Sequence, residues 1–145
     1  MSRPPRHLPQ GYSFHITLRC NSHKFLIAKA LLLDVLLAVL TRAQAKGPHR
    51  VYAVCLVANH LHLLIRLKEA SQLPRLMHWV GWYSAMATYC LAGRCEHFWE
   101  ARYYATTIDE NDHKRMLNTL EYIHANPKTA GSESGLLAPV AIIVF

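Results

Sequence analysis

The order in which strand-like and helix-like segments follow one another constrains the fold of this 145-residue chain more than any other feature. Strand-like segments alternate apolar and polar residues or are rich in β-branched and aromatic residues, whereas helix-like segments are longer and rich in Leu and Ala. Strands are predicted at residues 12–20, 51–58, 60–67 and 103–108, and helices at 26–45 and 73–91, with a last helix before Pro127. The order is therefore β-α-β-β-α-β-α.

An α+β, ferredoxin-like domain is the economical packing for this order, with two helices on one face of a four-stranded antiparallel sheet. A tight connection at Asn59 is predicted to join the second and third strands in a hairpin. The last helix is left over and is free to reach the open face of the sheet. No repeat or linker divides the chain, so residues 1–145 are interpreted as one domain, long enough to bury about two-thirds of its unfolded surface.

Local signals predict where the second and last helices begin and end. Gly93 lies just beyond the second helix, where glycine is common. The acidic side chains within residues 109–112 suit the N-terminal turn of the last helix, because the helix dipole favours negative charge there. This helix is predicted to end at Ala125 or Asn126, because Pro127 disfavours helical geometry at the residue before it.

Neither a membrane span nor a signal peptide is predicted. The most apolar stretch, residues 26–40, contains Lys29 and Asp34. It is also shorter than the roughly 20 apolar residues that a membrane-spanning helix needs, so it is interpreted as a buried amphipathic helix. Residues 1–10 carry three prolines and two arginines in place of the apolar core of a signal peptide.

The four cysteines indicate a reducing compartment, and the chain is predicted to be cytoplasmic. None of them is spaced as Cys-x-x-Cys, and two lie in apolar, strand-like runs, where cysteine serves as a small hydrophobic residue. A zinc site built on Cys90 and Cys95 is the alternative interpretation.

The positive charge is concentrated in the first half of the chain. The net charge of +7 divides into ten Lys and Arg against one acid over residues 1–68, and six against eight over residues 69–145. This asymmetry favours a polyanionic partner bound to a surface that the first half builds. The alternative is a basic face that is simply solvated.

Two histidines on the third predicted strand form a candidate pair of metal ligands. Residues two apart in a strand project from the same face, so His60 and His62 stand side by side while Leu61, Leu63 and Ile65 point to the core. Adjacent imidazoles of this kind can bind a divalent metal. The chain has ten histidines, so two half-exposed histidines on a solvated face are the alternative.

A tyrosine and an asparagine share one face of the last helix. Tyr122 and Asn126 are four residues apart, and each also has an ordinary structural role, in packing and at a helix end respectively. A phenol has a pKa near 10 and can attack a phosphodiester if a cation absorbs the developing charge. The Asn126 oxygen could complete a metal site with His60 and His62. Such nitrogen and oxygen ligands suit Mg²⁺ or Mn²⁺, and zinc also fits.

Several motifs together resemble those of the single-tyrosine HUH transposases, and of their REP-associated branch in particular. Residues 59–64, Asn-His-Leu-His-Leu-Leu, resemble the His-hydrophobe-His signature. Residues 122–131 resemble the Tyr-Ile-x-x-Asn-Pro-x-x-Ala-Gly stretch, and residues 98–103 the Trp-Glu-x-Arg-Tyr/Phe block. Residues 14–19 resemble the first strand. The resemblance covers about residues 11–131.

The resemblance implies a ferredoxin-like fold and a metal-dependent, single-stranded DNA endonuclease and strand transferase. Tyr122 would attack a DNA phosphate beside an imperfect hairpin, leaving a 5′-phosphotyrosine link and a free 3′-hydroxyl. His60 and His62 would bind Mg²⁺ or Mn²⁺, with Asn126 in the position of the third ligand. No organic cofactor and no membrane is implied. The tyrosine helix of relatives packs against its own domain or a partner's, which leaves a homodimer open.

Four basic residues are predicted to contact DNA phosphates: Arg19, Lys24, Arg66 and Arg102. The tail, residues 132–145, departs from the family pattern, because an apolar end replaces a Trp-containing segment. That departure motivates an alternative function, a module that binds hairpin nucleic acid without cutting it. A small metal protein unrelated to nucleic acid is a third hypothesis.

Overall fold

The computed structural model describes residues 6–23, 27, 30–93, 97–100, 102–134 and 141–144, which form an α+β domain. Its strands are β1 (Tyr12–Arg19), β2 (His49–Val57), β3 (His60–Leu67), β4 (Tyr104–Asp109) and β5 (Ala141–Val144). Its helices are α1 (Ala30–Gln44), α2 (Leu73–Ala92) and α3 (His113–Ser134). Single 3₁₀ turns lie at Asn21–His23 and Ala70–Gln72.

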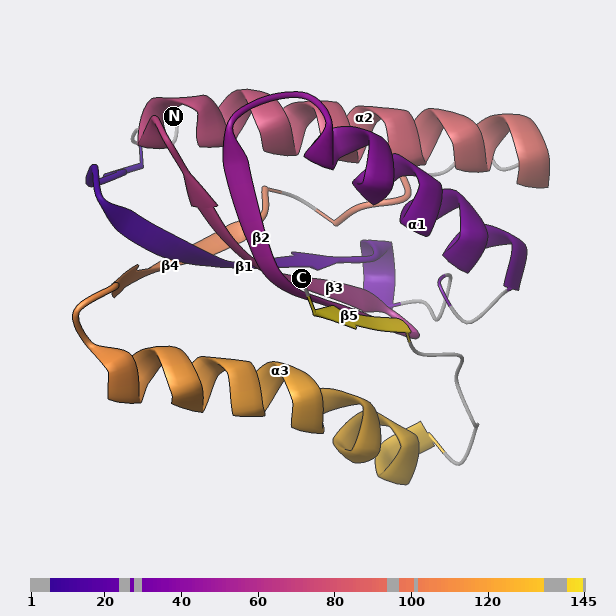
Figure 1. Ribbon diagram of the computed structural model, residues 1–145. Coiled ribbons are helices and arrows are strands. Elements are labelled where there is room, and N and C mark those ends of the chain that lie inside the picture. The colour runs from indigo at the N-terminus through magenta and orange to yellow at the C-terminus, as the bar shows by residue number, and fades with distance from the viewer. Residues whose placement is uncertain are drawn as a thin grey trace.

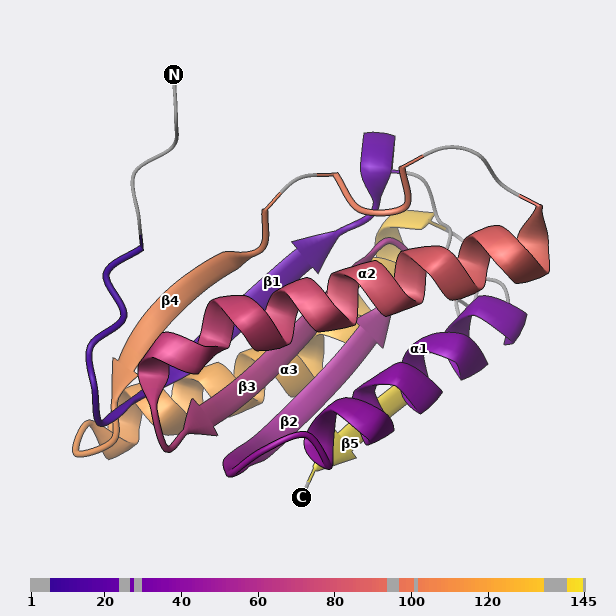
Figure 2. The same ribbon diagram turned by 90° about the horizontal axis from the view of Figure 1, so that it is seen from above.

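The sheet is antiparallel in every pairing, with the strand order β4-β1-β3-β2-β5. Helices α1 and α2 cover one face, and α3 lies against the other (Figure 1). Viewed from above, α1 and α2 lie in front of the strands and α3 lies behind them (Figure 2). The predicted α+β, ferredoxin-like arrangement with two helices on one face and the last helix apart is confirmed.

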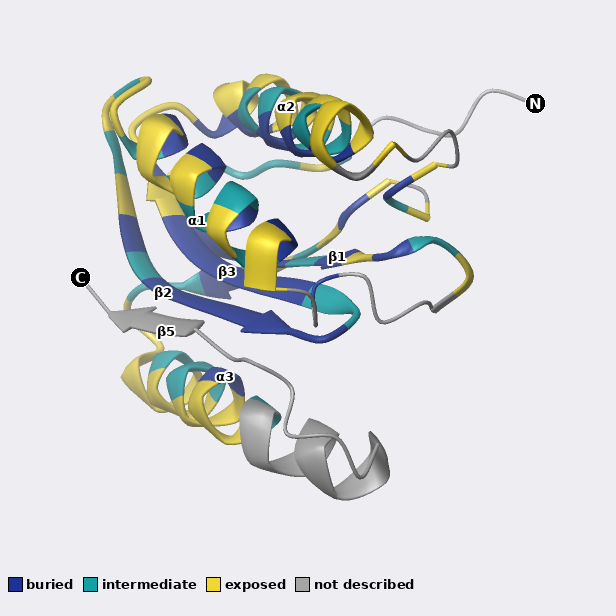
Figure 3. Cartoon of the chain, turned by 90° about the vertical axis from the view of Figure 1, so that its right-hand side faces the viewer, coloured by how far each residue is buried: buried dark blue, intermediate teal, exposed yellow. Residues whose placement is uncertain are grey.

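The main hydrophobic core lies between the sheet and the α1–α2 layer. Leu61, Leu63 and Ile65 of β3 are almost fully buried there, together with Phe14 and Ile16 of β1. Their two-residue spacing sends them all to one face, as the sequence predicts. Buried positions therefore follow the inner sides of α1 and α2 in Figure 3, while the outer sides are exposed.

A second, smaller core holds α3 against the opposite face. Leu64 of β3 and Ile108 of β4 are buried in this cluster with Ile123 of α3, whose side chain is 0% exposed. Asp112 caps the helix from outside its first turn, because its Oδ1 accepts a hydrogen bond from the Arg115 amide at 3.0 Å. Burial of Ile123 therefore fixes the position of the neighbouring residues of α3 relative to the sheet.

Ile123→Ala is expected to destabilise the protein by about 2–5 kcal/mol, because it removes a fully buried side chain from a small core that cannot collapse easily. Leu117→Ala on the same helix is the matched control. Leu117 is 60% exposed, so its truncation should change the free energy of unfolding by less than about 0.5 kcal/mol. Urea unfolding of both variants measures the difference; equal losses would show that α3 is not held by Ile123.

The ends of the first and last helices differ from the predicted ones. Helix α1 is described from Ala30 and Ile27 lies in a turn, while the predicted start at residue 26 lies outside the described residues. Helix α3 continues through Pro127 to Ser134, so the predicted end at Ala125 or Asn126 is wrong. The conformational bias on the residue before a proline is a local preference, and the turns on both sides override it here.

The acidic residues near the start of α3 lie outside its first turn, contrary to the prediction. Asp109 ends β4, Glu110 lies in the following turn, and Asp112 is the capping residue. Their carboxylates accept hydrogen bonds from particular groups outside the first turn of the helix. Asp109, for example, accepts from the backbone amide of Asn111 at 2.9 Å.

A fifth strand was not predicted. Within the tail that departs from the family pattern, β5 pairs antiparallel with β2, with Ala53 opposite Val144 and Leu56 opposite Ala141. The short apolar run satisfies the free edge of β2. No helix among the described residues is both long and apolar enough to cross a lipid bilayer.

Candidate active site

The predicted histidine pair stands on the α3-facing side of the sheet, at the start of β3. The ring centroids of His60 and His62 are 4.7 Å apart, with the ring planes at 85°. His60 is partly exposed, whereas the His62 side chain is only 3% exposed. His62 is therefore not a half-exposed residue on a solvated face, whereas the exposure of His60 matches that description.

Helix α3 brings Tyr122 of the same chain to this pair. The phenol ring packs edge-on against His62, with centroids 5.6 Å apart and planes at 87°. Its neighbour Ile123 faces the core, so Tyr122 is held at the helix flank and remains 54% exposed. The phenolic group is both close to the imidazoles and accessible to a ligand from solvent.

The hydrogen bonds of His60 indicate which of its nitrogens is free. Nδ1 lies 2.7 Å from Asn59 Oδ1, and since an amide oxygen only accepts, Nδ1 carries the proton. In the neutral ring Nε2 is then an acceptor, and it faces Asn126 Oδ1 at 3.3 Å. The Asn126 side chain interacts favourably with a protonated His60, and the same two atoms are close enough to bind one cation together.

The two ring nitrogens of His62 also differ in their surroundings. Nδ1 lies 3.1 Å from Nε2 of His15 and 3.3 Å from the Thr17 hydroxyl, both on the neighbouring strand β1. Nε2 is buried and makes no hydrogen bond of ordinary geometry within the described part of the protein, although the Asn126 side chain is near enough to interact with this imidazole and to oppose the lowering of its pKa. A buried polar atom of this kind calls for an explanation, and a ligand atom is one.

A divalent metal fits these residues. Around Mg²⁺, two ligands at right angles and about 2.1 Å from the ion lie about 3 Å apart, close to the 3.3 Å between His60 Nε2 and Asn126 Oδ1. Among the described residues no group of three or more His, Cys, Asp and Glu side chains has metal-site geometry. Burial raises the pKa of the Cys55 thiol, opposite His62 on β2, to about 11, which keeps it a poor ligand.

Burial keeps all three imidazoles uncharged. It lowers the pKa of His15 and of His60, and the interaction of His60 with Asn126 only partly opposes this. For His62, burial and then the nearby His60, His15 and Arg19 lower the pKa to about 3. At neutral pH each ring therefore keeps the lone pair that a metal ligand needs.

The low pKa of His62 makes the metal-free protein sensitive to acid. The unfolded chain takes up a proton below about pH 6.5 and the folded chain does not, so the free energy of unfolding falls as the pH drops below that value. His62 alone is expected to account for a loss of about 2 kcal/mol between about pH 7 and pH 5. Urea unfolding in chelator should show a shallower pH dependence for His62→Leu; an unchanged slope would contradict the buried, neutral state.

The four basic residues predicted to contact DNA are not gathered in one place. Arg19 is exposed at the end of β1, directly opposite His60 in the strand pairing. Arg66 lies at the far end of β3 and pairs with Glu110. Arg102 is exposed just before β4, and Lys24 lies outside the described residues. Of the three that the structure describes, only Arg19 lies beside the histidine pair.

His15 is a candidate site residue that the sequence reasoning did not select. Its ring lies 5.2 Å from that of His62 and 5.9 Å from that of Tyr122. The sequence contains a signal for it, because His15, Thr17 and Arg19 are spaced two residues apart and so share one face of the first strand. The strand pairing that places this row beside His62 was needed to recognise it.

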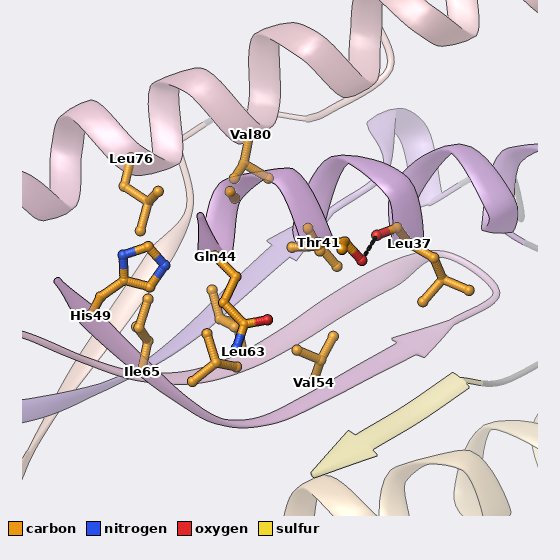
Figure 4. A pocket seen from close by; sticks show the side chains of 12 residues that line it. Leu37, Thr41, Gln44, His49, Val54, Leu63, Ile65, Leu76 and Val80 are labelled. Atoms are coloured by element: carbon orange, nitrogen blue, oxygen red, sulfur yellow. Dashed lines mark hydrogen bonds between the residues drawn. The ribbon is translucent and has the colours of Figure 1, made fainter. Parts of the chain in front are cut away.

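A cavity on the other side of the sheet is not part of this site. It measures about 30 Å³ and lies between α1, α2 and the strands, lined mainly by Leu and Val side chains such as Leu63 and Val80 (Figure 4). Its polar groups are few, and the Thr41 hydroxyl there already donates to the Leu37 carbonyl. None of the candidate site residues lines it.

The comparison with protein families agrees with the resemblance that the motifs carry. A model of the family described as IS200-like transposases matches residues 10–126. The chain therefore belongs to the IS200-like transposase family. None of the curated protein sequences matches it.

Solved structures share the fold. A REP-associated tyrosine transposase bound to a REP hairpin is 19% identical, with a TM-score of 0.72, and the match covers 90% of this chain and 75% of the other. A Deinococcus radiodurans R1 protein assigned as a transposase is 14% identical, with a TM-score of 0.52, and the match covers 84% of this chain and 97% of the other.

Proposed function

We propose that the protein is a metal-dependent, single-stranded DNA endonuclease and strand transferase in which Tyr122 is the nucleophile. The observation that supports this most is the contact between the Tyr122 ring and His62, beside a His60 nitrogen and an Asn126 oxygen that face each other. A phenol, two neutral imidazoles and an amide oxygen meet at one accessible point. Ordinary packing does not need that combination.

In the proposed reaction, the phenolic oxygen of Tyr122 attacks a DNA phosphorus atom. A bond forms between that oxygen and phosphorus, and the bond from phosphorus to the 3′-oxygen breaks. The 3′-oxygen leaves as a hydroxyl, and the phenolic proton passes to solvent, to which Tyr122 is exposed. One phosphodiester replaces another, so a later 3′-hydroxyl can reverse the step and join a new strand.

His60, His62 and Asn126 are the residues proposed to hold Mg²⁺ or Mn²⁺. When bound, the ion supplies Lewis-acid polarisation of the phosphate and stabilises the charge that develops on it. The chain's own contribution is to fix the ligands: Asn59 orients His60, and His15 and Thr17 orient His62.

Single-stranded DNA beside a hairpin is the proposed substrate. The structurally similar REP-associated transposase is bound to a REP hairpin, and the first half of this chain is strongly basic. Arg19 stands opposite His60 at the open end of the site, where it can hold a phosphate. Arg102 and Lys24 are further proposed contacts, and Arg66 would first have to leave Glu110.

The test is incubation with Mn²⁺ and a labelled hairpin oligonucleotide that carries single-stranded flanks, followed by denaturing electrophoresis. A covalent adduct survives denaturant, so a labelled band at the mass of protein plus DNA is the expected result. Salt-dependent binding without such a band would overturn the enzymatic proposal and favour a module that only binds hairpins.

His15→Phe is expected to weaken Mn²⁺ binding by about tenfold, because it removes the nitrogen that orients His62. His15→Gln, which can keep a polar partner near Nδ1, should restore part of the affinity. Isothermal titration with Mn²⁺ measures both variants. Equal Mn²⁺ affinities of wild type and His15→Phe would show that His15 does not orient His62 for metal binding.

A further inference from the structure

Tyr104, the first residue of β4, is the most exposed large hydrophobic side chain among the described residues, at 69%. Its neighbour Tyr103 is 8% exposed and packs in the core beneath α2. Strand alternation therefore sends the two tyrosines to opposite faces. Burial explains Tyr103, and nothing within the fold needs the exposed ring of Tyr104.

The strand pairing places Tyr104 in the same cross-strand row as the histidine site. Tyr104 is opposite Thr17, and Thr17 is opposite His62. The Thr17 hydroxyl approaches His62 Nδ1 at 3.3 Å, which fixes the face to which Thr17 points. Since directly opposed residues of antiparallel strands share a face, Tyr104 projects on the side of His62, two strand spacings or roughly 10 Å away.

This part of the sheet forms an open shelf beside Tyr122, and we call it the β1–β4 shelf: Thr17, Arg19, Tyr104 and Thr106. Helix α3 makes most of its contacts with β2. Strand β4 is the edge strand beyond β1 (Figure 2). Thr106 is exposed like Tyr104, and it lies two residues further along β4 on the same face.

Charge along the shelf gives it a direction. Arg19 lies at one end, beside His60 and near the start of β4, while Asp109 and Glu110 lie at the other end. Arg19 and the exposed Arg102 attract a polyanionic strand to the first end, where the exposed Glu100 also lies. Asp109 repels it from the second end, where Glu110 is paired with Arg66. Tyr104 lies at the attractive end, so a backbone held there brings its bases over the exposed ring.

We propose that Tyr104 is a stacking platform for one base of the single strand, within a few nucleotides of the phosphate that Tyr122 attacks. The inference rests on the proposed function for the position of that phosphate. Aromatic side chains beside a basic groove are a common means of holding single-stranded nucleic acid, because every base presents a π face. The contact positions the strand and favours an unpaired base at that point over a paired one.

The first experiment compares side chains at position 104 in a Tyr122→Phe background, where binding stays non-covalent. Tyr104→Ala is expected to weaken binding of a hairpin oligonucleotide with single-stranded flanks by at least about fivefold, and Tyr104→Phe should retain the affinity. Tyr89→Ala, which removes a 53% exposed tyrosine from α2 on the opposite face, is the control and should have no effect. Equal losses for Phe and Ala at position 104 would overturn a stacking role.

The second experiment removes one base at a time from the flanking strand by abasic substitution. One position should weaken binding to the Tyr104-containing protein by the same factor as Tyr104→Ala, and that same position should have no further effect on the alanine variant. Additive losses at every position would overturn the proposal. A change in sedimentation of the alanine variant without any change in DNA affinity would also overturn it, and would assign the shelf to contact between copies of the chain.

The two proposals fail in different ways. A covalent adduct formed by wild type, together with no effect of Tyr104→Ala on binding, refutes the stacking platform and leaves the nuclease. If one abasic position weakens binding and this loss does not add to that of Tyr104→Ala, while wild type forms no covalent adduct, the stacking role of Tyr104 is supported and the proposed reaction is refuted.

Discussion

Tyr122→Phe is expected to reduce formation of the covalent DNA adduct by at least about a thousandfold, while binding to the hairpin oligonucleotide stays largely unchanged. The reason is that the ring and the hydroxyl of Tyr122 have different roles. Its ring contacts His62 and His15, and those contacts survive the substitution, whereas the hydroxyl is the group that attacks phosphorus. The comparison needs both a denaturing gel and a binding curve under the same conditions.

Tyr83→Phe is the matched control for this variant. It also removes a phenolic hydroxyl from a partly exposed tyrosine, but one on α2, on the far side of the sheet. Its adduct yield should equal that of wild type. A Tyr122→Phe protein that still forms the adduct at the wild-type rate would exclude this nucleophile.

His62→Ala is expected to lower Mn²⁺ affinity and adduct yield together, each by more than about a hundredfold. The substitution removes a proposed ligand nitrogen that is buried and makes no hydrogen bond of ordinary geometry among the described residues. It also leaves His60 and Asn126 as an incomplete pair. Isothermal titration with Mn²⁺ gives the affinity independently of any reaction, so loss of metal and loss of chemistry can be compared in one protein.

His78→Ala is the control for loss of an imidazole, since His78 is exposed on α2 and away from the site. It should change neither quantity. Metal affinity that survives loss of both His60 and His62 would place the ion elsewhere in the chain. A normal adduct yield in chelator-treated protein would show that the reaction does not need a metal.

Local patterns were sufficient to predict the sheet and the face of the histidine pair. The strand β3 was predicted with its observed bounds, His60–Leu67, because alternation has a period of two and one misplaced residue would turn Leu61 and Leu63 away from the main core. The proximity of Tyr122 to His62 also agrees with the geometry that the motifs imply. The strand bounds and the face of the histidine pair depend on residues that are close in sequence, or on a strand register that the hydrophobic pattern specifies strongly.

Features that depend on long-range pairing could not be predicted. The hydrogen bond between His15 and His62 joins residues 47 positions apart, and it exists only because β1 lies next to β3. The pairing of Arg66 with Glu110 likewise depends on where the turn after β4 falls. Strand β5 occupies the free edge of β2, which a four-stranded prediction leaves open.

The extension of α3 beyond Pro127 was missed for a different reason. The prediction applied the conformational preference of the residue before a proline as though it ended the helix. A 22-residue helix can continue through one such position, because its other turns keep their hydrogen bonds. Asn126 consequently lies within α3, one helical turn beyond Tyr122, which brings its amide to His60.

Identification of the residue that becomes attached to DNA tests the central claim most directly. After reaction with a short oligonucleotide, trypsin should release residues 116–128 as one peptide, which contains Tyr122 and none of the other six tyrosines. Mass spectrometry is expected to find the nucleotide mass on this peptide, and fragmentation is expected to place it on Tyr122. Attachment to a peptide that carries any other tyrosine would contradict the site described here.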